Sequence, residues 1–384
     1  MLFREVIGHH SVKETLRRAV REDRVAHGQL LAGPEGSGGL PLAIAYARYL
    51  SCENRGPEEA CDTCPSCVTY RKLVHPDLHV IFPVNTTRKV TSHPTSSKFL
   101  TEWREALLEQ PYQNLFQWLE HIGIENKQGS INVADSAEVL RNLSLTAVES
   151  AYRIVIIWLP EKLNMAAGNK LLKIIEEPPA RTVFLLVSED PERILPTIYS
   201  RLQLVHLGRI DSGSLAQQLQ AAHGLDAGTA TSIAHFADGN YLEAQKLVAE
   251  DVEVSPHEQA FVQWMRWCYQ TDVLHIVPWV DDMAAMGRER QKHFLRYALH
   301  VFRECLMLNY GAGELVHVEG SERAFIDKFA RFVHGNNILP LQEAFNEAIA
   351  HIERNANPKV LFLDLSLKVI LLLRKKPVES PAEG

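Results

Sequence analysis

The sequence has no apolar run long enough to cross a membrane. The longest candidate, at 360–373, is interrupted by Asp364, Ser366 and Lys368, whereas a spanning helix needs about 20 predominantly apolar residues. The first ten residues, MLFREVIGHH, also lack the basic and apolar stretches of a secretory signal peptide. We therefore expect a cytoplasmic protein with no membrane partner, in a compartment that keeps thiols reduced.

An excess of positive charge is also missing. The 384 residues carry 40 basic and 47 acidic side chains, a formal net charge of −7, which gives no global reason to expect binding to nucleic acid. Apolar residues make up 46% and charged residues 23% of the chain, as in ordinary globular proteins. A chain of this length is expected to form two or three domains.

The first half of the chain alternates short apolar strands with helical patterns, which is typical of an α/β domain with a parallel sheet. The predicted strands span 29–31, 78–82, 153–158, 182–187 and 203–207. Ser11 and Glu14 have the spacing of a capping box at the start of the first helix. The segment at about 85–130 carries Trp103 and Trp118 at helical spacing. We predict that it is an inserted helical hairpin, and nothing in it suggests chemistry.

After the last predicted strand the pattern becomes helical to the end. We predict an α/β domain at 1–208, a small helical lid at 209–253 and a larger all-helical domain at 254–375. The lid would contain two or three short helices, with a break at Gly239 and Asn240. The tail at 376–384 is polar and contains proline, so it is predicted to be disordered.

A glycine-rich loop, Gly33-Pro-Glu-Gly36-Ser-Gly38-Gly39-Leu40, stands between the first predicted strand and the next helix. A P-loop, G-x-x-x-x-G-K-[ST], belongs at this place. Its amides hold phosphates, its lysine neutralises their charge and its hydroxyl binds magnesium. Here Gly39 stands at the lysine position and Leu40 at the hydroxyl position. Gly33, Gly36 and Gly38 alone could form an anion-binding nest, or the segment could be a turn that never bound nucleotide.

Four of the six cysteines, Cys52, Cys61, Cys64 and Cys67, form the pattern C-x8-C-x2-C-x2-C. Two overlapping C-x-x-C turns place three thiols on one side of the backbone, and Cys52 supplies the fourth. Four cysteines are typical of a closed structural zinc site. A disulfide or a redox C-x-x-C fits a reduced cytoplasm poorly, and nothing nearby suggests the electron transfer of an iron–sulfur cluster. We predict structural zinc in this module, at 52–67.

Several motifs occur together in one order along the chain. Besides the glycine loop, they are V-I-G-H at 6–9, A-H-G at 26–28, N-K-L-L-K-I-I-E-E-P-P at 169–179 and S-R-L at 200–202. In this order they resemble the AAA+ subunits of bacterial DNA polymerase III clamp loaders, and the delta-prime branch more than the ATP-hydrolysing gamma/tau branch. The resemblance covers residues 1 to about 210 by motif and the remainder by layout. It implies a P-loop fold of the AAA+/RecA type, followed by the lid and by a helical collar that holds a hetero-oligomer together.

The resemblance also implies that the chain is not an ATPase. It places the acidic pair of active relatives at Trp158 and Leu159, which can neither hold magnesium nor orient water. The sensor arginine of the lid falls on Leu242. Ser188 stands at the position that senses the γ-phosphate, but it has nothing to sense without the lysine and the magnesium ligands. We therefore expect that ATP is neither bound nor hydrolysed.

Arg201 is interpreted differently. In the family, the arginine of an S-R-C motif enters a neighbouring subunit's ATP site as an arginine finger, and fingers in general raise rates roughly 10³–10⁵-fold. This chain keeps Ser200 and Arg201 but has Leu202 at the third position. Without the resemblance, a surface arginine in an ion pair worth at most ~1 kcal/mol is the simpler interpretation. With it, Ser200 and Arg201 are predicted to complete a neighbour's catalytic site in trans.

The resemblance therefore implies a non-hydrolysing clamp-loader subunit. Its implied partners are gamma/tau-type ATPase subunits, a delta-type subunit, the sliding clamp and, through the assembly, primed DNA. Two alternatives stay open, an active P-loop ATPase with substitute residues and a zinc-bearing scaffold for another AAA+ assembly. Glu176 and Glu177, which precede two prolines, are predicted to fix the turn into the next strand or to contact a neighbouring subunit.

Overall fold

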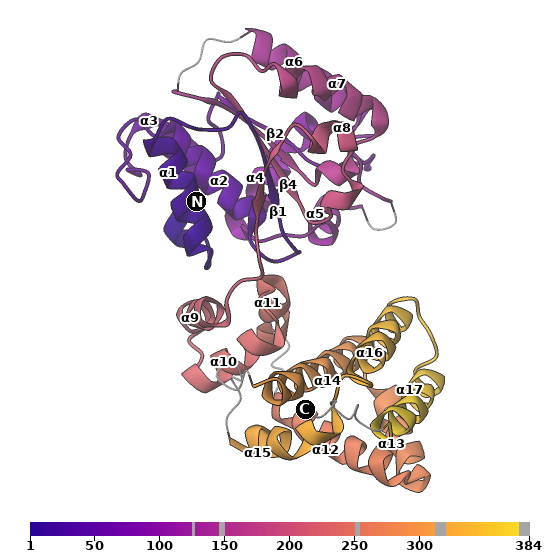
Figure 1. Ribbon diagram of the computed structural model, residues 1–384. Helices are drawn as coiled ribbons and strands as arrows, with labels where there is room; N and C mark the ends of the chain where they lie inside the picture. The colour runs from indigo at the N-terminus through magenta and orange to yellow at the C-terminus, as the bar shows by residue number, and fades with distance from the viewer. Residues whose placement is uncertain (125–126, 146–149, 250–253, 312–319, 376–384) are drawn as a thin grey trace, which may run out of the picture. The chain divides into compact units, whose positions relative to one another are not determined.

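The computed structural model describes residues 1–124, 127–145, 150–249, 254–311 and 320–375. The chain divides into two compact units, Met1–Glu250 and Asp251–Gly384. The first contains a parallel sheet with its helices and a group of three short helices, and the second is helical (Figure 1). The predicted disordered tail at 376–384 lies outside the described residues, and so does the predicted domain boundary at residue 253.

Five parallel strands form one sheet in the order β2-β3-β4-β1-β5. The strands are β1 (Gly28–Ala32), β2 (Leu78–Ile81), β3 (Arg153–Trp158), β4 (Thr182–Ser188) and β5 (Gln203–His206). All five predicted strands are confirmed, with each end within one residue of its predicted place. The central strands are unbroken apolar runs because both of their faces are covered, and every residue of β4 is buried.

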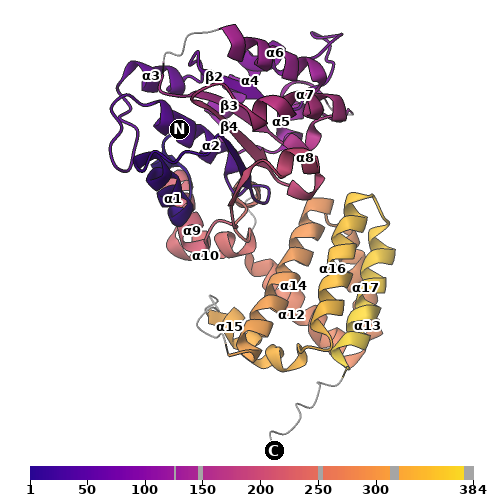
Figure 2. The same cartoon turned by 45° about the horizontal axis from the view of Figure 1, so that its top comes forward.

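Helices cover both faces of the sheet (Figure 2). Successive strand residues point to opposite faces, so Leu31 packs into one core with α2 (Gly39–Ser51). Leu30 packs into the other core with α7 (Met165–Glu176). The sheet region also contains α1 (His10–Arg21), α3 (Pro65–Arg71), α6 (Val133–Leu145) and α8 (Pro196–Tyr199). The predicted fold class, a P-loop-type parallel sheet followed by helical regions, is confirmed.

The segment predicted as a helical hairpin contains α4 (Leu100–Glu109) and α5 (Leu115–His121). Trp103 stacks on Phe82 with 5.0 Å between the ring centroids, and Trp118 meets the same ring edge-on at 5.1 Å. The two predicted helices are confirmed. Their tryptophans belong to the main core, so the helices are packed onto the end of β2.

The first helix begins two residues earlier than the sequence pattern predicts. α1 starts at His10, and its N-cap is His9, which has φ 55° and makes no side-chain capping hydrogen bond. The predicted capping box at Ser11 and Glu14 is therefore wrong, because Ser11 lies inside the first turn. The His9 ring instead lies against the glycine loop, with Nε2 2.7 Å from the carbonyl oxygen of Ser37. This contact fixes the left-handed turn that starts the helix.

Three short helices follow the sheet, as predicted for the lid. They are α9 (Ser212–His223), α10 (Ala227–Phe236) and α11 (Tyr241–Ala249). Asp211 and Asp226 cap α9 and α10 by accepting the backbone N–H three residues ahead. The break before α11 contains Gly239 at φ +73°, where an added Cβ would lie 2.5 Å from the carbonyl oxygen of Ile210. Glycine is needed there for both reasons.

The second unit is helical where the structure describes it. Its helices are α12 (Val254–Gln270), α13 (Val273–Ala285), α14 (Arg288–Asn309), α15 (Gly320–Phe329), α16 (Ile338–Glu353) and α17 (Pro358–Leu373). In α14, Phe294, Leu295 and Phe302 lie in the core, each at most 1% exposed. Among the described residues, no helix is both long and apolar enough to span a membrane.

Candidate functional site

The glycine loop joins β1 to α2 at the carboxyl ends of the strands. Gly33 N–H donates to the carbonyl oxygen of Ser188 at 3.1 Å, and an added Cβ at Gly33 would lie 2.7 Å from Leu207. Gly36 and Gly38 have φ angles of +74° and +92°, in the left-handed region that favours glycine. The backbone therefore follows the strand–loop–helix course of a P-loop.

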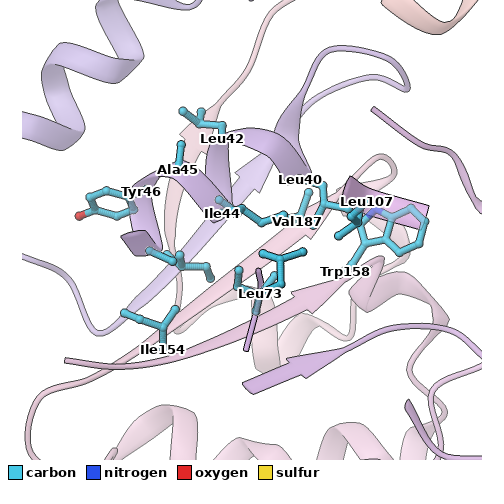
Figure 3. Close-up of a cluster of buried hydrophobic side chains, with 14 of the residues drawn as sticks. Leu40, Leu42, Ile44, Ala45, Tyr46, Leu73, Leu107, Ile154, Trp158 and Val187 are labelled. Atoms are coloured by element: carbon cyan, nitrogen blue, oxygen red, sulfur yellow. The ribbon is translucent and has the colours of Figure 1, made fainter. Parts of the chain in front are cut away.

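Buried apolar side chains stand at the positions where the sequence resemblance placed the magnesium ligands. Leu40, at the hydroxyl position, is buried in one cluster with Trp158 and Val187. Figure 3 shows these side chains gathered with Leu107. Trp158 and Leu159, at the positions of the acidic pair, are 2% and 1% exposed. Magnesium takes oxygen ligands, and the side chains of Leu40, Trp158 and Leu159 offer none.

Tyr112, between α4 and α5, lies directly against the glycine loop. An added Cβ at Gly38 would lie 2.8 Å from its ring. The phenol oxygen accepts a hydrogen bond from Ile7 N–H at 2.9 Å, and the ring meets Tyr241 of α11 edge-on with 4.8 Å between centroids. Sequence reasoning missed this residue, because no local pattern relates Tyr112 to a loop so far away in the chain.

The lid contributes a second set of contacts to the loop. Tyr241 N–H donates to the carbonyl oxygen of Gly36 at 3.2 Å. An added Cβ at Gly36 would lie 1.8 Å from Asn240 Oδ1, so the asparagine sits on the loop backbone. Beside them, Gln110 Nε2 donates to Gln245 Oε1 at 2.7 Å. The chain's own side chains thus join the lid to the core at the loop.

An acidic residue, and no basic one, is found among the described residues that line the pocket beside the loop. Of the described residues that line the remaining pocket, Glu189 is the only charged one. Burial, and then the charges of Glu35 and Glu161, raise the pKa of Glu189 to about 8. Ser188 Oγ donates to Glu161 at 2.9 Å, and Glu189 N–H donates to it at 3.1 Å. Ser188 therefore supports a carboxylate, and a phosphate group entering the pocket would meet acidic side chains.

The four clustered cysteines surround a common centre. Their sulfur atoms all lie within 4.8 Å of one another, and sulfurs at about 2.3 Å from a tetrahedral zinc ion would be about 3.8 Å apart. Cys52 is the C-cap of α2 and Cys64 is the N-cap of α3. N–H···S contacts of 3.2, 3.3 and 3.4 Å run from Cys61 to Cys52, from Cys64 to Cys61 and from Cys67 to Cys64. The arrangement could hold a metal ion.

The thiols of this cluster differ in their acidity. Hydrogen bonds from the backbone N–H groups of Thr63 and then Cys64 lower the pKa of Cys61 to about 6, so Cys61 is mainly a thiolate at neutral pH. The thiolate is the form that binds metals. Burial raises the pKa of Cys67 to about 12. A bound cation would favour deprotonation of all four thiols together.

Ion pairs and backbone contacts tie the cysteine loop to its surroundings. Asp62, at φ +63°, pairs with the buried Arg48 of α2 and, at 2.8 Å, with Arg71 of α3. Glu59 accepts the backbone N–H of Phe3 at 3.0 Å. The loop is therefore fixed to both flanking helices and to the N-terminal segment.

The predicted finger, Ser200 and Arg201, lies at the opposite ends of the strands from the glycine loop. An added Cβ at Gly28, the first residue of β1, would lie 3.4 Å from the carbonyl oxygen of Arg201. The glycine loop begins after Ala32, the last residue of β1, and five strand residues extend about 17 Å. The structure therefore does not bring Arg201 and the glycine loop of one chain together.

Arg201 makes contacts within its own chain. Its Nε lies 3.1 Å from Glu176 Oε2, and its Nη1 donates to the carbonyl oxygen of Thr197 at 2.8 Å. Ser200 Oγ lies 3.5 Å from the same Nη1. The ion pair that sequence reasoning offered as the simpler interpretation is present, while the role of Arg201 as a finger stays a prediction.

Comparison with known proteins identifies sequence relatives. A family model described as "DNA polymerase III, delta subunit" matches residues 8–211. DNA polymerase III subunit tau of Bacillus subtilis is 26% identical over 263 residues, which cover 66% of this chain and 38% of that protein. Subunit delta' of the same organism is 27% identical over 192 residues, 50% of this chain and 45% of that one. Subunit delta' of Pseudomonas aeruginosa is 29% identical over 176 residues, 46% of this chain and 41% of that one. The chain spans less than half the length of each of these relatives.

Two solved structures are also similar, at low scores. A DNA polymerase III gamma subunit-related protein of Thermotoga maritima is 13% identical with a TM-score of 0.35, over 94% of this chain and 99% of that one. The RuvB Holliday junction branch migration motor of the same organism is 18% identical with a TM-score of 0.38, over 64% of this chain and 62% of that one. Neither superposes closely on this chain.

Proposed function

Since the chain belongs to the DNA polymerase III delta subunit family, we propose that it is a clamp-loader subunit that completes a neighbouring subunit's ATP site without hydrolysing ATP itself. The observation that carries this proposal is the burial of Leu40 and Trp158 in one apolar cluster, at the positions where magnesium ligands would stand. Tyr112 against Gly38 adds a steric obstacle to a bound nucleotide, and none of the described residues that line the remaining pocket is basic.

The position of Arg201 supports an action in trans. An arginine at the amino ends of the strands cannot reach a phosphate held about 17 Å away at their carboxyl ends, so it cannot serve its own glycine loop. It is exposed on the surface and is therefore available to another chain. We place it in the ATP site of a gamma/tau-type neighbour, where a guanidinium would stabilise the charge that develops on the transferred phosphoryl group.

The proposed partners follow from the family. Relatives of this chain are named as tau and delta' subunits of DNA polymerase III. We propose that this chain assembles with gamma/tau-type ATPase subunits and a delta-type subunit, that the assembly binds the sliding clamp, and that the chain meets primed DNA through the assembly. The four-cysteine cluster would hold a structural Zn²⁺.

The helices at 254–375 are proposed to form the collar through which the subunits associate. In α17, Val360, Leu363, Leu367 and Leu371 are 67%, 37%, 49% and 69% exposed. Their spacing of three and four residues places them along one side of the helix. Such an apolar stripe on a surface is suited to contact with another protein. Replacing Leu367 and Leu371 by serine is expected to weaken assembly, as measured by analytical ultracentrifugation.

Phe116→Ser is the control variant. Phe116 is 69% exposed on α5, so this change also removes an apolar side chain from the surface, but outside the proposed collar, and assembly should be unchanged. If the chain with both α17 replacements assembles as tightly as the unmodified chain, the collar proposal is wrong. It would leave the ATP-site proposal standing, because that rests on the first unit alone.

Two measurements test the ATP-site proposal as a whole. The full chain should not bind a fluorescent ATP analogue or hydrolyse ATP, and it should co-purify with clamp-loader ATPase subunits from cells. ATP turnover by the isolated chain would favour an active ATPase with substitute residues. Co-purification with a different AAA+ assembly, without the clamp-loader subunits, would favour the zinc-bearing scaffold.

A further inference from the structure

Glu176 holds the guanidinium of Arg201 in one orientation. The carboxylate oxygen Oε2 is 3.1 Å from Nε, and the carbonyl oxygen of Thr197 accepts from Nη1 at 2.8 Å. Two of the three guanidinium nitrogens are therefore engaged on one side. Among the residues that the structure describes, no hydrogen-bond partner meets Nη2.

Folding alone does not account for this ion pair. The side chains of Arg201 and Glu176 are 36% and 55% exposed, and exposed pairs of this kind contribute between about 0 and 1 kcal/mol to stability. Glu176 is also the last residue of α7. A negative charge there meets the negative end of the helix dipole, which is unfavourable by roughly 0.3–1 kcal/mol. The contact thus contributes little to the stability of this chain.

We propose that Glu176 is a positioning residue for Arg201, which it presents with the free Nη2 edge directed to a phosphate of the neighbouring subunit. The inference rests on the proposed action of Arg201 in trans. An arginine that is already fixed loses less side-chain entropy when it engages the transition state. The carboxylate itself touches neither ATP nor the reacting atoms, so it acts through Arg201 alone.

The neighbouring Glu177 supplies a matched control. It carries the same charge one residue away and is exposed, and among the described residues its carboxylate has no ion-pair partner. Glu176→Ala and Glu177→Ala therefore remove the same charge from the same surface, but only the first frees Arg201. Glu176→Gln keeps an oxygen that can accept from Nε without the negative charge.

The experiment measures kcat and KM for ATP in the reconstituted clamp-loader complex containing the full chain, after mass photometry shows equal assembly. Glu176→Ala is expected to remove most of the kcat that depends on Arg201. KM should stay within about twofold, because the arginine acts on the transition state. Glu176→Gln should restore part of the loss. Glu177→Ala should match the unmodified complex, and Glu176→Ala combined with Arg201→Ala should match Arg201→Ala alone.

Three outcomes would overturn the inference while leaving the proposed function intact. They are an unchanged or higher kcat with Glu176→Ala, an equal loss with Glu177→Ala, and a double variant slower than Arg201→Ala alone. The last would show that Glu176 acts independently of the arginine. An Arg201→Ala complex with unchanged kcat would overturn the proposed function itself, so the two failures are distinguishable.

Discussion

The two ends of α2 carry the two motifs that the sequence suggested, and they differ in what has been kept. At the amino end, the glycine loop keeps the backbone course of a phosphate-binding loop. Its side-chain ligands have been replaced by Gly39 and the buried Leu40. At the carboxyl end, Cys52 caps the helix, and all four cysteine sulfurs lie close enough to share one ion.

The comparison shows that packing within the chain is enough to hold the backbone of the glycine loop. The glycine loop has structural work that does not depend on nucleotide, since Gly36 and Gly38 lie against Asn240 and Tyr112. The cysteine cluster has no comparable packing role that would remain without its ion. A metal site needs its full ligand set, so losing one thiol leaves the remaining three with an incomplete coordination sphere.

The largest expected effect on stability is that of removing a cysteine ligand or the metal at the carboxyl end of α2. Cys64→Ser, or removal of metal with a chelator, should lower the free energy of unfolding by on the order of 5 kcal/mol, because metal binding is coupled to folding of the loop. Thermal unfolding together with elemental analysis for zinc measures this.

Ser66→Ala, in the same module, is the control for Cys64→Ser. Ser66 is buried, and its hydroxyl has no hydrogen-bond partner among the residues that the structure describes, so stability and zinc content should be nearly unchanged. Iron in place of zinc, or well under one zinc per chain in the unmodified protein, would refute a structural zinc site.

The next largest effect is expected from introducing the P-loop residues at the amino end of α2. Gly39→Lys with Leu40→Thr recreates the P-loop sequence, but we expect no ATP binding and a loss of about 3 kcal/mol of stability, as a polar group enters the core. An added Cβ at Gly39 already lies 3.0 Å from Val187. Urea unfolding and titration with a fluorescent ATP analogue test both parts. Regained binding would show that the loop lost only its side chains and that the surrounding packing is no obstacle.

Tyr112 offers a sharper test of how the loop is held. Tyr112→Ala should destabilise the first unit by about 3 kcal/mol through loss of a buried aromatic ring. It should also increase hydrogen exchange in the glycine loop and in α11, which the ring joins. Tyr112→Phe keeps the ring and loses only the hydrogen bond to Ile7 N–H, so about 1 kcal/mol is expected. Equal exchange in all three proteins would show that the tyrosine does not join lid and core.

The smallest expected effect is a pH dependence from Glu189. Its pKa is raised from 4.5 to about 8 in the folded chain, so between these values the folded state holds a proton that the unfolded state has released. The stabilisation is present below pH 4.5 and is lost as pH rises to about 8. Urea unfolding at pH 6 and pH 8 should show that Glu189→Gln loses about 2 kcal/mol less than the unmodified chain over this interval. Parallel pH profiles would contradict the shift.

The sequence was sufficient for the parts of the fold that local patterns determine. The five strands were predicted from apolar runs such as 153–158, which need burial on both faces. The lid helices were predicted from the break at Gly239. The cysteine cluster followed from spacing alone, since neighbouring C-x-x-C turns bring thiols together whatever surrounds them.

Contacts between distant segments could not be predicted in this way. The first helix starts at His10 because the His9 ring lies against Ser37, and this contact overrides the capping pattern at Ser11. Tyr112 escaped notice because its contact to Gly38 depends on how two segments pack. The pairing of Glu176 with Arg201 depends in the same way on the tertiary fold.

The apolar cluster that buries Leu40 and Trp158 also bears on how this chain can change over evolutionary time. A lineage that acquired nucleotide hydrolysis would pass through intermediates in which one polar residue faces an otherwise apolar cluster. Each such intermediate is less stable and has no compensating activity, because the lysine, the hydroxyl and the acidic pair are useful only together. Selection would remove these intermediates before the set was complete. The buried cluster is therefore an energetic barrier to introducing the polar ligands one at a time.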